Sequence, residues 1–166
     1  MEVLCELRGH ADRAWHVSWH PFARGVLASC GGDHALRVWA AAPSAVAAAG
    51  AAAAGAGAAP PPAFRCAAVV DDFTARTVRC CEWSPCGRFL AAGSFDGRVT
   101  IWRVRGLPRS EAAAAAAEAA GAGDAAPAVG LDFLSTLEGH EHEVKGVAWS
   151  ADGGLLATCS LSLIHI

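Results

Sequence analysis

The sequence has little net charge and no long run of large apolar residues. Its 166 residues include 13 Lys or Arg and 16 Asp or Glu, which leaves a net charge of −3. This near balance gives no electrostatic case for binding nucleic acid or an anionic membrane. The longest apolar-looking run, residues 45–63, is mainly Ala and Gly and contains three prolines. It is therefore too weakly hydrophobic and too broken to span a bilayer.

The sequence also lacks the features of a secreted protein or a zinc site. Its first ten residues, MEVLCELRGH, carry charges and no apolar stretch of the kind found in a signal peptide. The seven cysteines are odd in number and form no C-x-x-C pair. Four of them lie in strand-like runs, where free cysteine packs as a small hydrophobic residue: Cys30, Cys80, Cys81 and Cys159. We therefore expect a reducing compartment, the cytoplasm, with the nucleus as a second candidate.

One stretch organises the rest of the chain. Residues 76–102, RTVRCCEWSPCGRFLAAGSFDGRVTIW, have the pattern of three short strands joined by two tight turns. The expected strands are Val78–Trp83, Arg88–Gly93 and Arg98–Trp102. Pro and Gly in the first turn and Asp-Gly in the second are typical of tight connections. The third strand alternates, with Val99 and Ile101 on one face and Thr100 and Trp102 on the other.

The same pattern occurs twice more along the chain. Residues 14–39 read AWHVSWHPFARGVLASCGGDHALRVW, and residues 144–160 read VKGVAWSADGGLLATCS. Trp19, Trp83 and Trp149 align, at separations of 64 and 66 residues. A repeat of this kind determines the architecture, because each unit is one supersecondary element that stacks on its neighbours.

Two insertions of biased composition interrupt the repeats. Residues 40–63 are mostly Ala and Gly, and residues 104–130 are rich in Ala. Both fall between the third and fourth strands of a unit, and without them the period is roughly 40 residues, the length of a propeller blade. We expect both insertions to be disordered, the first with loose helix as the alternative and the second with a marginal helix after a capping Ser110. Further strands are expected at residues 3–7, 64–70 and 131–137.

The repeats resemble those of the WD40 family. The family's Gly-His and Trp positions are matched by Gly9-His10, Gly139-His140, Trp39 and Trp102. Ala40 and Arg103 replace the Asp that follows the Trp in that family. The predicted fold is all-β, an incomplete WD40 propeller of four-stranded antiparallel blades. The predicted units are repeat one with an N-terminal strand at 1–39, an insertion at 40–63, repeat two at 64–103, an insertion at 104–130, a partial repeat three at 131–160 and a tail at 161–166.

The resemblance implies a hydrogen-bonded line of His, Ser or Thr, Asp and Trp through each blade. Its positions are held by His10, Ser29, Asp33 and Trp39 in repeat one, Asp96 and Trp102 in repeat two, and His140 and Thr158 in repeat three. In repeat two, Thr74 replaces the His and Ala92 replaces the hydroxyl; in repeat three, Ser162 replaces the Asp. Asp accepts from one His nitrogen, and the hydroxyl meets both the other ring nitrogen and the indole N–H. Such a line is stabilising where every member is satisfied.

Two other interpretations of these residues are open. His10, Ser29 and Asp33 have the residue types of a hydrolase triad, but the pattern recurs with the repeat, which a triad does not. The histidines and cysteines could bind zinc, but the adjacent Cys80 and Cys81 point to opposite faces of a strand. We therefore predict a structural role, with no enzymatic activity, no cofactor and no metal.

Most of the chain outside the insertions resembles, more narrowly, the WD40 subunits of cytosolic iron–sulfur protein assembly. The segments LASCGGDHALRVW, RTVRCCEWSPCGRFLAAGSFDGRVTIW and STLEGHEHEVKGVAWSADGGLLATCS carry this resemblance. It implies a scaffold that helps to target clusters to cytosolic and nuclear apoproteins and binds no cluster itself. The implied partners are a HEAT-repeat adaptor, a small partner subunit and a cluster-carrying protein, with no nucleic acid or membrane.

Candidate partner contacts lie at loop positions before the first strand of a repeat and just ahead of the turn Asp: Arg13, Arg76, Phe95 and Glu143. Each could instead be an ordinary solvated loop residue. The alternative function is another WD40 interaction scaffold, such as a ubiquitin-ligase substrate receptor or a subunit of a chromatin or transport complex.

The pattern fails after Ser160. Leu161 stands where the iron–sulfur family has an arginine, and no Trp-containing third strand follows. We predict that residues 161–166 are not native sequence, with a short splice form as the alternative. An open set of blades exposes strand edges and apolar faces, which favours aggregation. The expected shape is an open arc with the insertions as unpacked loops.

Overall fold

A computed structural model describes residues 5–42, 45–48, 62–119, 125–161 and 164–165. The first sheet contains β1 (Ala14–Trp19), β2 (Val26–Gly31), β3 (Leu36–Ala41) and β4 (Phe64–Val70). The second contains β5 (Val78–Trp83), β6 (Phe89–Ser94), β7 (Val99–Arg105) and β8 (Gly130–Leu137). The third contains β9 (Val144–Trp149), β10 (Leu156–Ser160) and the two-residue β11 (Ile164–His165). Every recorded pairing is antiparallel, and we call the sheets blades one, two and three.

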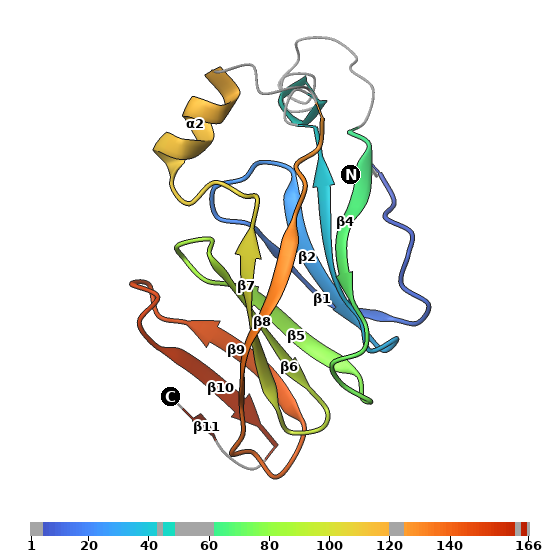
Figure 1. The fold of residues 1–166 in the computed structure, drawn as a ribbon. Coiled ribbons are helices and arrows are strands. Elements are labelled where there is room, and N and C mark those ends of the chain that lie inside the picture. The colour runs from blue at the N-terminus through green and yellow to red at the C-terminus, as the bar shows by residue number, and fades with distance from the viewer. Residues whose placement is uncertain (1–4, 43–44, 49–61, 120–124, 162–163, 166) are drawn as a thin grey trace.

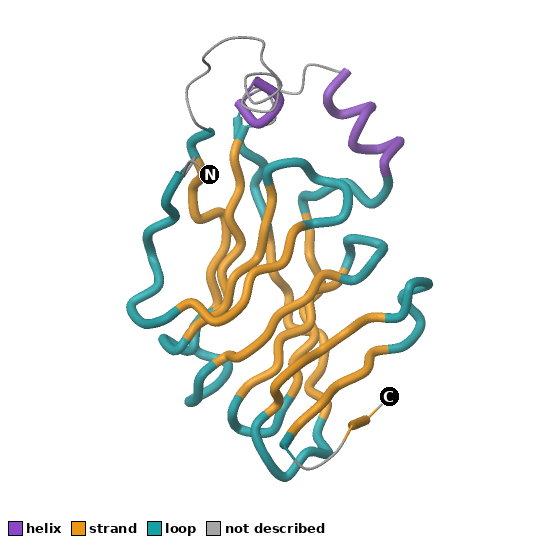
Figure 2. The backbone as a smooth tube through the Cα atoms, turned by 180° about the vertical axis from the view of Figure 1, so that it is seen from behind, coloured by secondary structure: helices purple, strands orange, loops and turns teal. Residues whose placement is uncertain are grey.

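The three blades lie side by side, with the first strands of neighbouring blades against each other, β1 with β5 and β5 with β9 (Figures 1 and 2). Blades one and two have the order 1-2-3-4, and their first hairpins carry register shifts at equivalent places, at Ala14/His16 and Val78/Cys80. The repeat predicted from sequence is therefore a repeat of structure. Both insertions leave from the third strand and return at the fourth, as predicted.

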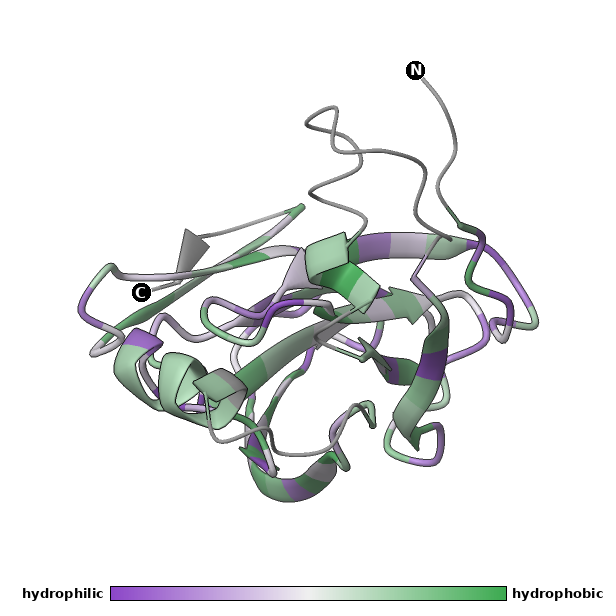
Figure 3. Ribbon diagram, turned by 90° about the horizontal axis from the view of Figure 1, so that it is seen from above, coloured by the Kyte–Doolittle hydropathy of each residue, from purple (hydrophilic) through white to green (hydrophobic). Residues whose placement is uncertain are grey.

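Two apolar clusters hold the blades together. The larger lies between blades one and two and includes Leu36, Val38, Trp83 and Trp102. The smaller lies between blades two and three and includes Val99, Ile101 and Val144. Hydrophobic residues predominate along the strands that supply them, with hydrophilic residues interspersed (Figure 3). The predicted alternation along β7 is confirmed, since alternate residues serve different clusters.

The first strands also join the blades through polar contacts. The Trp83 indole N–H donates to the carbonyl oxygen of Ser18 at 3.1 Å. The Trp149 indole N–H repeats this contact one blade further on, donating to the backbone carbonyl oxygen of Glu82 at 3.3 Å. The equivalent Trp19 is 60% exposed, because no blade precedes it in the described part of the chain. The expected exposure of an apolar blade face is thus confirmed on β1.

His20 forms a second polar link between blades one and two. Its ring is 6% exposed and packs edge-on against Trp83, with 4.7 Å between ring centroids. Its Nδ1 accepts the backbone N–H of Ala23 at 2.8 Å, and its Nε2 donates to the carbonyl of Gly87 at 3.2 Å. Burial lowers the pKa of His20, and the Gly87 contact opposes the shift only in part. The buried His20 is therefore neutral near pH 7.

Several expectations need correction. Of the strand expected at residues 3–7, residues 5–7 are irregular, because no neighbouring strand pairs with them in the described structure, and residues 3 and 4 lie outside the described residues. β3 continues through Ala41 and β7 through Arg105, past the tryptophans at which we expected them to end. The ends of the second insertion are not unpacked: Leu107, Ala126 and Val129 contact the larger cluster.

The insertions contain some regular structure. Helix α2 (Glu111–Ala119) forms where the Ala run predicts it, so disorder does not hold for these residues. The side chain of Ser110 accepts the N–H of Ala113 at 3.2 Å, as expected of a helix cap. Residues 45–48 form one helical turn. The rest of the first insertion falls largely outside the described residues. No described helix is long and apolar enough to cross a membrane.

Candidate functional site

Blade one contains a continuous hydrogen-bonded line between its loops and its core. His10 Nδ1 lies 2.8 Å from Asp33 Oδ1, and its Nε2 lies 2.7 Å from Ser29 Oγ. The Trp39 indole N–H donates to the same Ser29 oxygen at 2.8 Å. With the His10 proton on Nδ1, the carboxylate accepts from His10, the Ser29 O–H donates to Nε2, and every member of the line has a partner. The structure thus brings together all four residues singled out in repeat one.

Asp33 also fixes the turn that holds this line. Its carboxylate accepts the backbone N–H groups of Ala11 at 3.0 Å and Ala35 at 3.3 Å, and lies 3.6 Å from the Arg37 guanidinium. Burial by itself would raise the pKa of Asp33, but the hydrogen bonds from His10, Ala11 and Ala35 outweigh it and hold the pKa below its usual value. Asp33 is therefore ionised near neutral pH and ties two loops together.

The same distances would suit a hydrolase triad, so access to the serine distinguishes the two roles. Ser29 is 4% exposed, and its oxygen lies between the rings of His10 and Trp39. A nucleophile must approach a substrate carbonyl, whereas this oxygen already accepts an indole N–H and is enclosed. The geometry of Ser29 therefore fits a structural line better than acyl transfer.

In blade two, other residues form hydrogen bonds at the positions of the blade-one line. Thr74, at the His position, donates its hydroxyl to Asp96 Oδ2 at 3.0 Å. The Trp102 indole N–H donates to Thr100 Oγ1 at 3.0 Å, two residues back on its own strand. Sequence analysis noted the missing hydroxyl at Ala92 but did not recognise this replacement. The signal was available, since Thr100 and Trp102 were placed on one face of the strand. Ser94 also hydrogen-bonds to Asp96.

Blade three retains the middle of the line. His140 Nε2 lies 2.9 Å from Thr158 Oγ1, as His10 lies near Ser29 in blade one. Thr158 is 7% exposed. Ser162, predicted to replace the Asp, lies outside the described residues. Backbone pairing of β11 with β10 joins His165 to Thr158 and Ile164 to Cys159.

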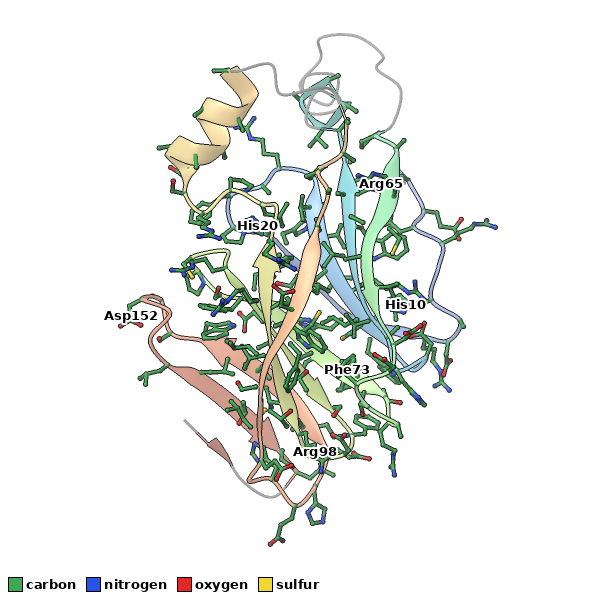
Figure 4. The ribbon with its side chains drawn as sticks, in the orientation of Figure 1. His10, His20, Arg65, Phe73, Arg98 and Asp152 are labelled. Atoms are coloured by element: carbon green, nitrogen blue, oxygen red, sulfur yellow. The ribbon has the colours of Figure 1, made fainter. Side chains whose placement is uncertain are left out.

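The four candidate contact residues lie on one edge of the three sheets. This edge, which we call the lower rim, is made of residues 8–15, 32–35, 71–79, 95–98 and 138–145. Arg13, Arg76 and Glu143 precede β1, β5 and β9, and Phe95 lies in the β6–β7 turn. His10 and Arg98 mark this edge in Figure 4, with His20 and Arg65 towards the opposite one. Arg13 and Arg76 are exposed, and Phe95 and Glu143 are half-buried.

Three rim residues that sequence analysis missed complete this surface. They occupy one repeat position at the start of each first strand: Trp15, Arg79 and Lys145. The Arg13 and Arg79 guanidinium groups lie 5.7 and 5.1 Å from the Trp15 ring centroid. Lys145 Nζ lies 4.4 Å from the Phe95 ring and 2.5 Å from Glu143. Cations stacked on aromatic rings are well suited to protein contacts. The aligned repeat position was the signal that could have revealed them.

The cysteines are placed for packing rather than for ligation. Cys30, Cys80 and Cys81 are buried, and Cys80 and Cys81 face different clusters, as their adjacency predicts. Burial raises the pKa of Cys80 to about 12. A hydrogen bond with Cys30, followed by burial, raises the pKa of Cys81. Both thiols keep their protons, whereas metal ligation requires thiolate. In the described part of the chain, no group of three or more His, Cys, Asp or Glu could hold a metal ion.

The repeated four-stranded sheets and the hydrogen-bonded line of His10, Ser29, Asp33 and Trp39 are features of a repeat protein of the propeller class. The family described as "WD domain, G-beta repeat" matches residues 1–40, 65–103 and 131–165. These segments make up more than half of the chain, and the chain belongs to the WD40 repeat family.

Three of the relatives that it matches have names connected with iron–sulfur protein assembly or the designation CIA1. A protein of Mycosarcoma maydis named "Probable cytosolic iron-sulfur protein assembly protein 1" is 38% identical over 167 residues, covering 96% of this chain and 36% of the relative. A Cryptococcus neoformans protein of the same name is 36% identical, with coverage of 96% and 38%. "Protein CIA1" of Arabidopsis thaliana is 38% identical over 104 residues, 59% of this chain and 25% of that protein. The chain thus spans little more than a third of the first two relatives and a quarter of the third.

Proposed function

We propose that this chain is a non-enzymatic WD40 scaffold of cytosolic iron–sulfur protein assembly, which helps to target clusters to cytosolic and nuclear apoproteins. The observation that carries the proposal is its similarity, over 96% of its length, to relatives named for this process. The whole assembly would include a HEAT-repeat adaptor, a small partner subunit and a cluster-carrying protein. The cluster is cargo in this proposal, and this chain does not hold it.

The character of the polar residues supports a scaffold. Ser29, whose hydroxyl lies in triad-like geometry with His10 and Asp33, is enclosed by its neighbours and bonded to Trp39. Cys80 and Cys81 are buried with raised pKa values, which disfavours nucleophilic attack and cluster ligation alike. The Ser29 hydroxyl and these two buried thiols therefore fit a role in stabilising the blades.

The lower rim is the surface that would meet a partner. Arg79 and Trp15 form one stacked pair and Lys145 and Phe95 another, on neighbouring blades. Such pairs combine apolar area with fixed charge, the combination that interface hot spots favour. Arg76 adds an exposed cation just before β5.

Binding to a purified HEAT-repeat adaptor from the same organism tests the proposal. The assay compares the whole chain with Arg76→Glu on the lower rim and with Arg24→Glu as a matched control. Both arginines are exposed, but Arg24 lies in the β1–β2 turn on the opposite edge. We expect Arg76→Glu to weaken binding roughly tenfold or more and Arg24→Glu to leave it unchanged.

Two results would contradict the proposal. Equal weakening by Arg76→Glu and Arg24→Glu would rule out the lower rim as the contact surface. No binding to the adaptor, together with saturable binding to a cullin or histone-complex subunit, would favour the alternative WD40 scaffold.

A further inference from the structure

The second insertion begins and ends in segments that pack against each other. It leaves blade two at the end of β7 and returns at the start of β8, and these two strands pair with each other. Gly106, just after β7, has φ +85°, and a Cβ built on it would overlap the carbonyl oxygen of Ala128. The two arms thus meet at a point where only glycine fits. We call these arms, residues 105–109 and 125–130, the stem.

One side of the stem covers the apolar cluster between blades one and two. Leu107 of the outgoing arm and Ala126 and Val129 of the returning arm contact this cluster. The cluster contains side chains of both blades, among them Cys30 of blade one and Cys81 of blade two, which are fully buried. The stem belongs to blade two in sequence, but it packs on the junction of two blades.

Arg65 ties the stem to blade one. It is the second residue of β4 and lies towards the upper end of that strand (Figure 4). Its Nη2 donates to the carbonyl oxygens of Ala126 at 2.6 Å and Pro127 at 3.2 Å. The contact of Trp83 with Ser18 joins the same two blades at their first strands. Arg65 joins them at their fourth strands, which form the opposite edge of each sheet.

We propose that the second insertion is a strap, latched by Arg65, that locks blades one and two together. The junction carries part of the lower rim, since the Arg79 guanidinium of blade two lies 5.1 Å from the ring centroid of Trp15 in blade one. The strap therefore fixes the spacing of these two rim residues from the other end of the blades. Helix α2 lies between the two arms in sequence and takes no part in the strap.

Labelling of buried cysteines in the native whole chain tests the strap. Cys30 and Cys81 lie in the cluster that the stem covers, whereas Cys80 lies in the cluster between blades two and three and serves as an internal control. The rate at which iodoacetamide labels each thiol, followed by tandem mass spectrometry of peptides, reports how often its surroundings open. An opened strap should therefore expose the first two thiols and leave the third protected.

Two substitutions act on the strap itself. Arg65→Met removes the latch and should raise the labelling rates of Cys30 and Cys81 about three- to tenfold, because a hydrogen bond from a charged donor contributes on this scale. Leu107→Ala removes apolar contact from the stem and should raise the same rates about tenfold. The matched control is Arg103→Met, at an exposed position on β7, which should leave every rate unchanged.

A third variant separates the stem from the helix that it carries. Replacement of Glu111–Ala119 by a Gly-Ser segment of equal length should leave all labelling rates unchanged. An equal rise at Cys80 and Cys81 would overturn the proposal, because the whole chain would then be destabilised. Unchanged rates in both Arg65→Met and Leu107→Ala would also overturn it. No partner enters the assay, so its result is independent of the iron–sulfur proposal.

Discussion

Replacing Ser29 by Ala should destabilise the fold more than any other single hydroxyl deletion in these blades. The substitution removes the oxygen that joins Trp39 to His10, at 2.8 and 2.7 Å. It leaves the Trp39 indole N–H, on a residue 3% exposed, and the His10 Nε2 without that partner. An unsatisfied buried polar group costs about 1–3 kcal/mol, so we expect a loss of about 2–4 kcal/mol in the free energy of unfolding.

Urea denaturation followed by far-UV circular dichroism measures this loss. The matched control is Thr100→Val in blade two, which leaves the Trp102 indole N–H without its hydroxyl partner and removes the long 3.4 Å bond from Thr100 to the carbonyl of Ala92; it should cost about 1–2 kcal/mol. A double-mutant cycle isolates the contact. In a Trp39→Phe background, Ser29→Ala should cost about 1–2 kcal/mol less, because no indole N–H remains to be orphaned. A Ser29→Ala loss below about 0.5 kcal/mol, or strict additivity with Trp39→Phe, would refute the reasoning.

Three further predictions follow from particular residues. Burial favours neutral His20, so the unfolded chain binds more protons below pH 6.5, and stability should fall as the pH drops through that window; His20→Asn should flatten this slope in urea titrations at pH 7 to 5. Gly97 has φ +83° and a built Cβ 2.6 Å from the carbonyl of His140, so Gly97→Ala should cost about 1–3 kcal/mol, whereas Gly154→Ala should cost about 0.5 kcal/mol or less by the same assay. Cys66 is exposed and should react with iodoacetamide in the native chain, whereas Cys80, whose pKa is about 12, should be labelled only after denaturation, as peptide mass spectrometry would show.

The repeat made most of the fold predictable from sequence. β5 begins and ends where its β-branched and aromatic run predicts, at Val78–Trp83, and β4 likewise at Phe64–Val70. The turn at Asp96-Gly97 forms, with Gly97 at positive φ. These signals are local, because they depend on the alternation of apolar and polar residues and on turn residues. Most of them occur in all three repeats.

The features that were missed depend on contacts between distant segments. Leu107 packs against the core between blades one and two, and nothing in the composition around it distinguishes it from an unpacked loop residue. Thr100 replaces a hydroxyl that the repeat places on another strand, so alignment alone pointed to Ala92. His20 stands where the other repeats have Ser84 and Ser150, and its link to Gly87 spans two blades. Such contacts follow from tertiary geometry rather than from a pattern along the chain.

The most direct test of the proposed scaffold role is cluster loading in cells. Iron–sulfur occupancy of a cytosolic cluster protein and of a mitochondrial one would be measured after the gene for this chain is repressed. The account predicts that the cytosolic protein loses its cluster while the mitochondrial protein keeps it, and that wild-type sequence restores loading whereas Arg76→Glu restores it poorly. Unchanged occupancy of the cytosolic protein, or equal loss in both compartments, would contradict the account.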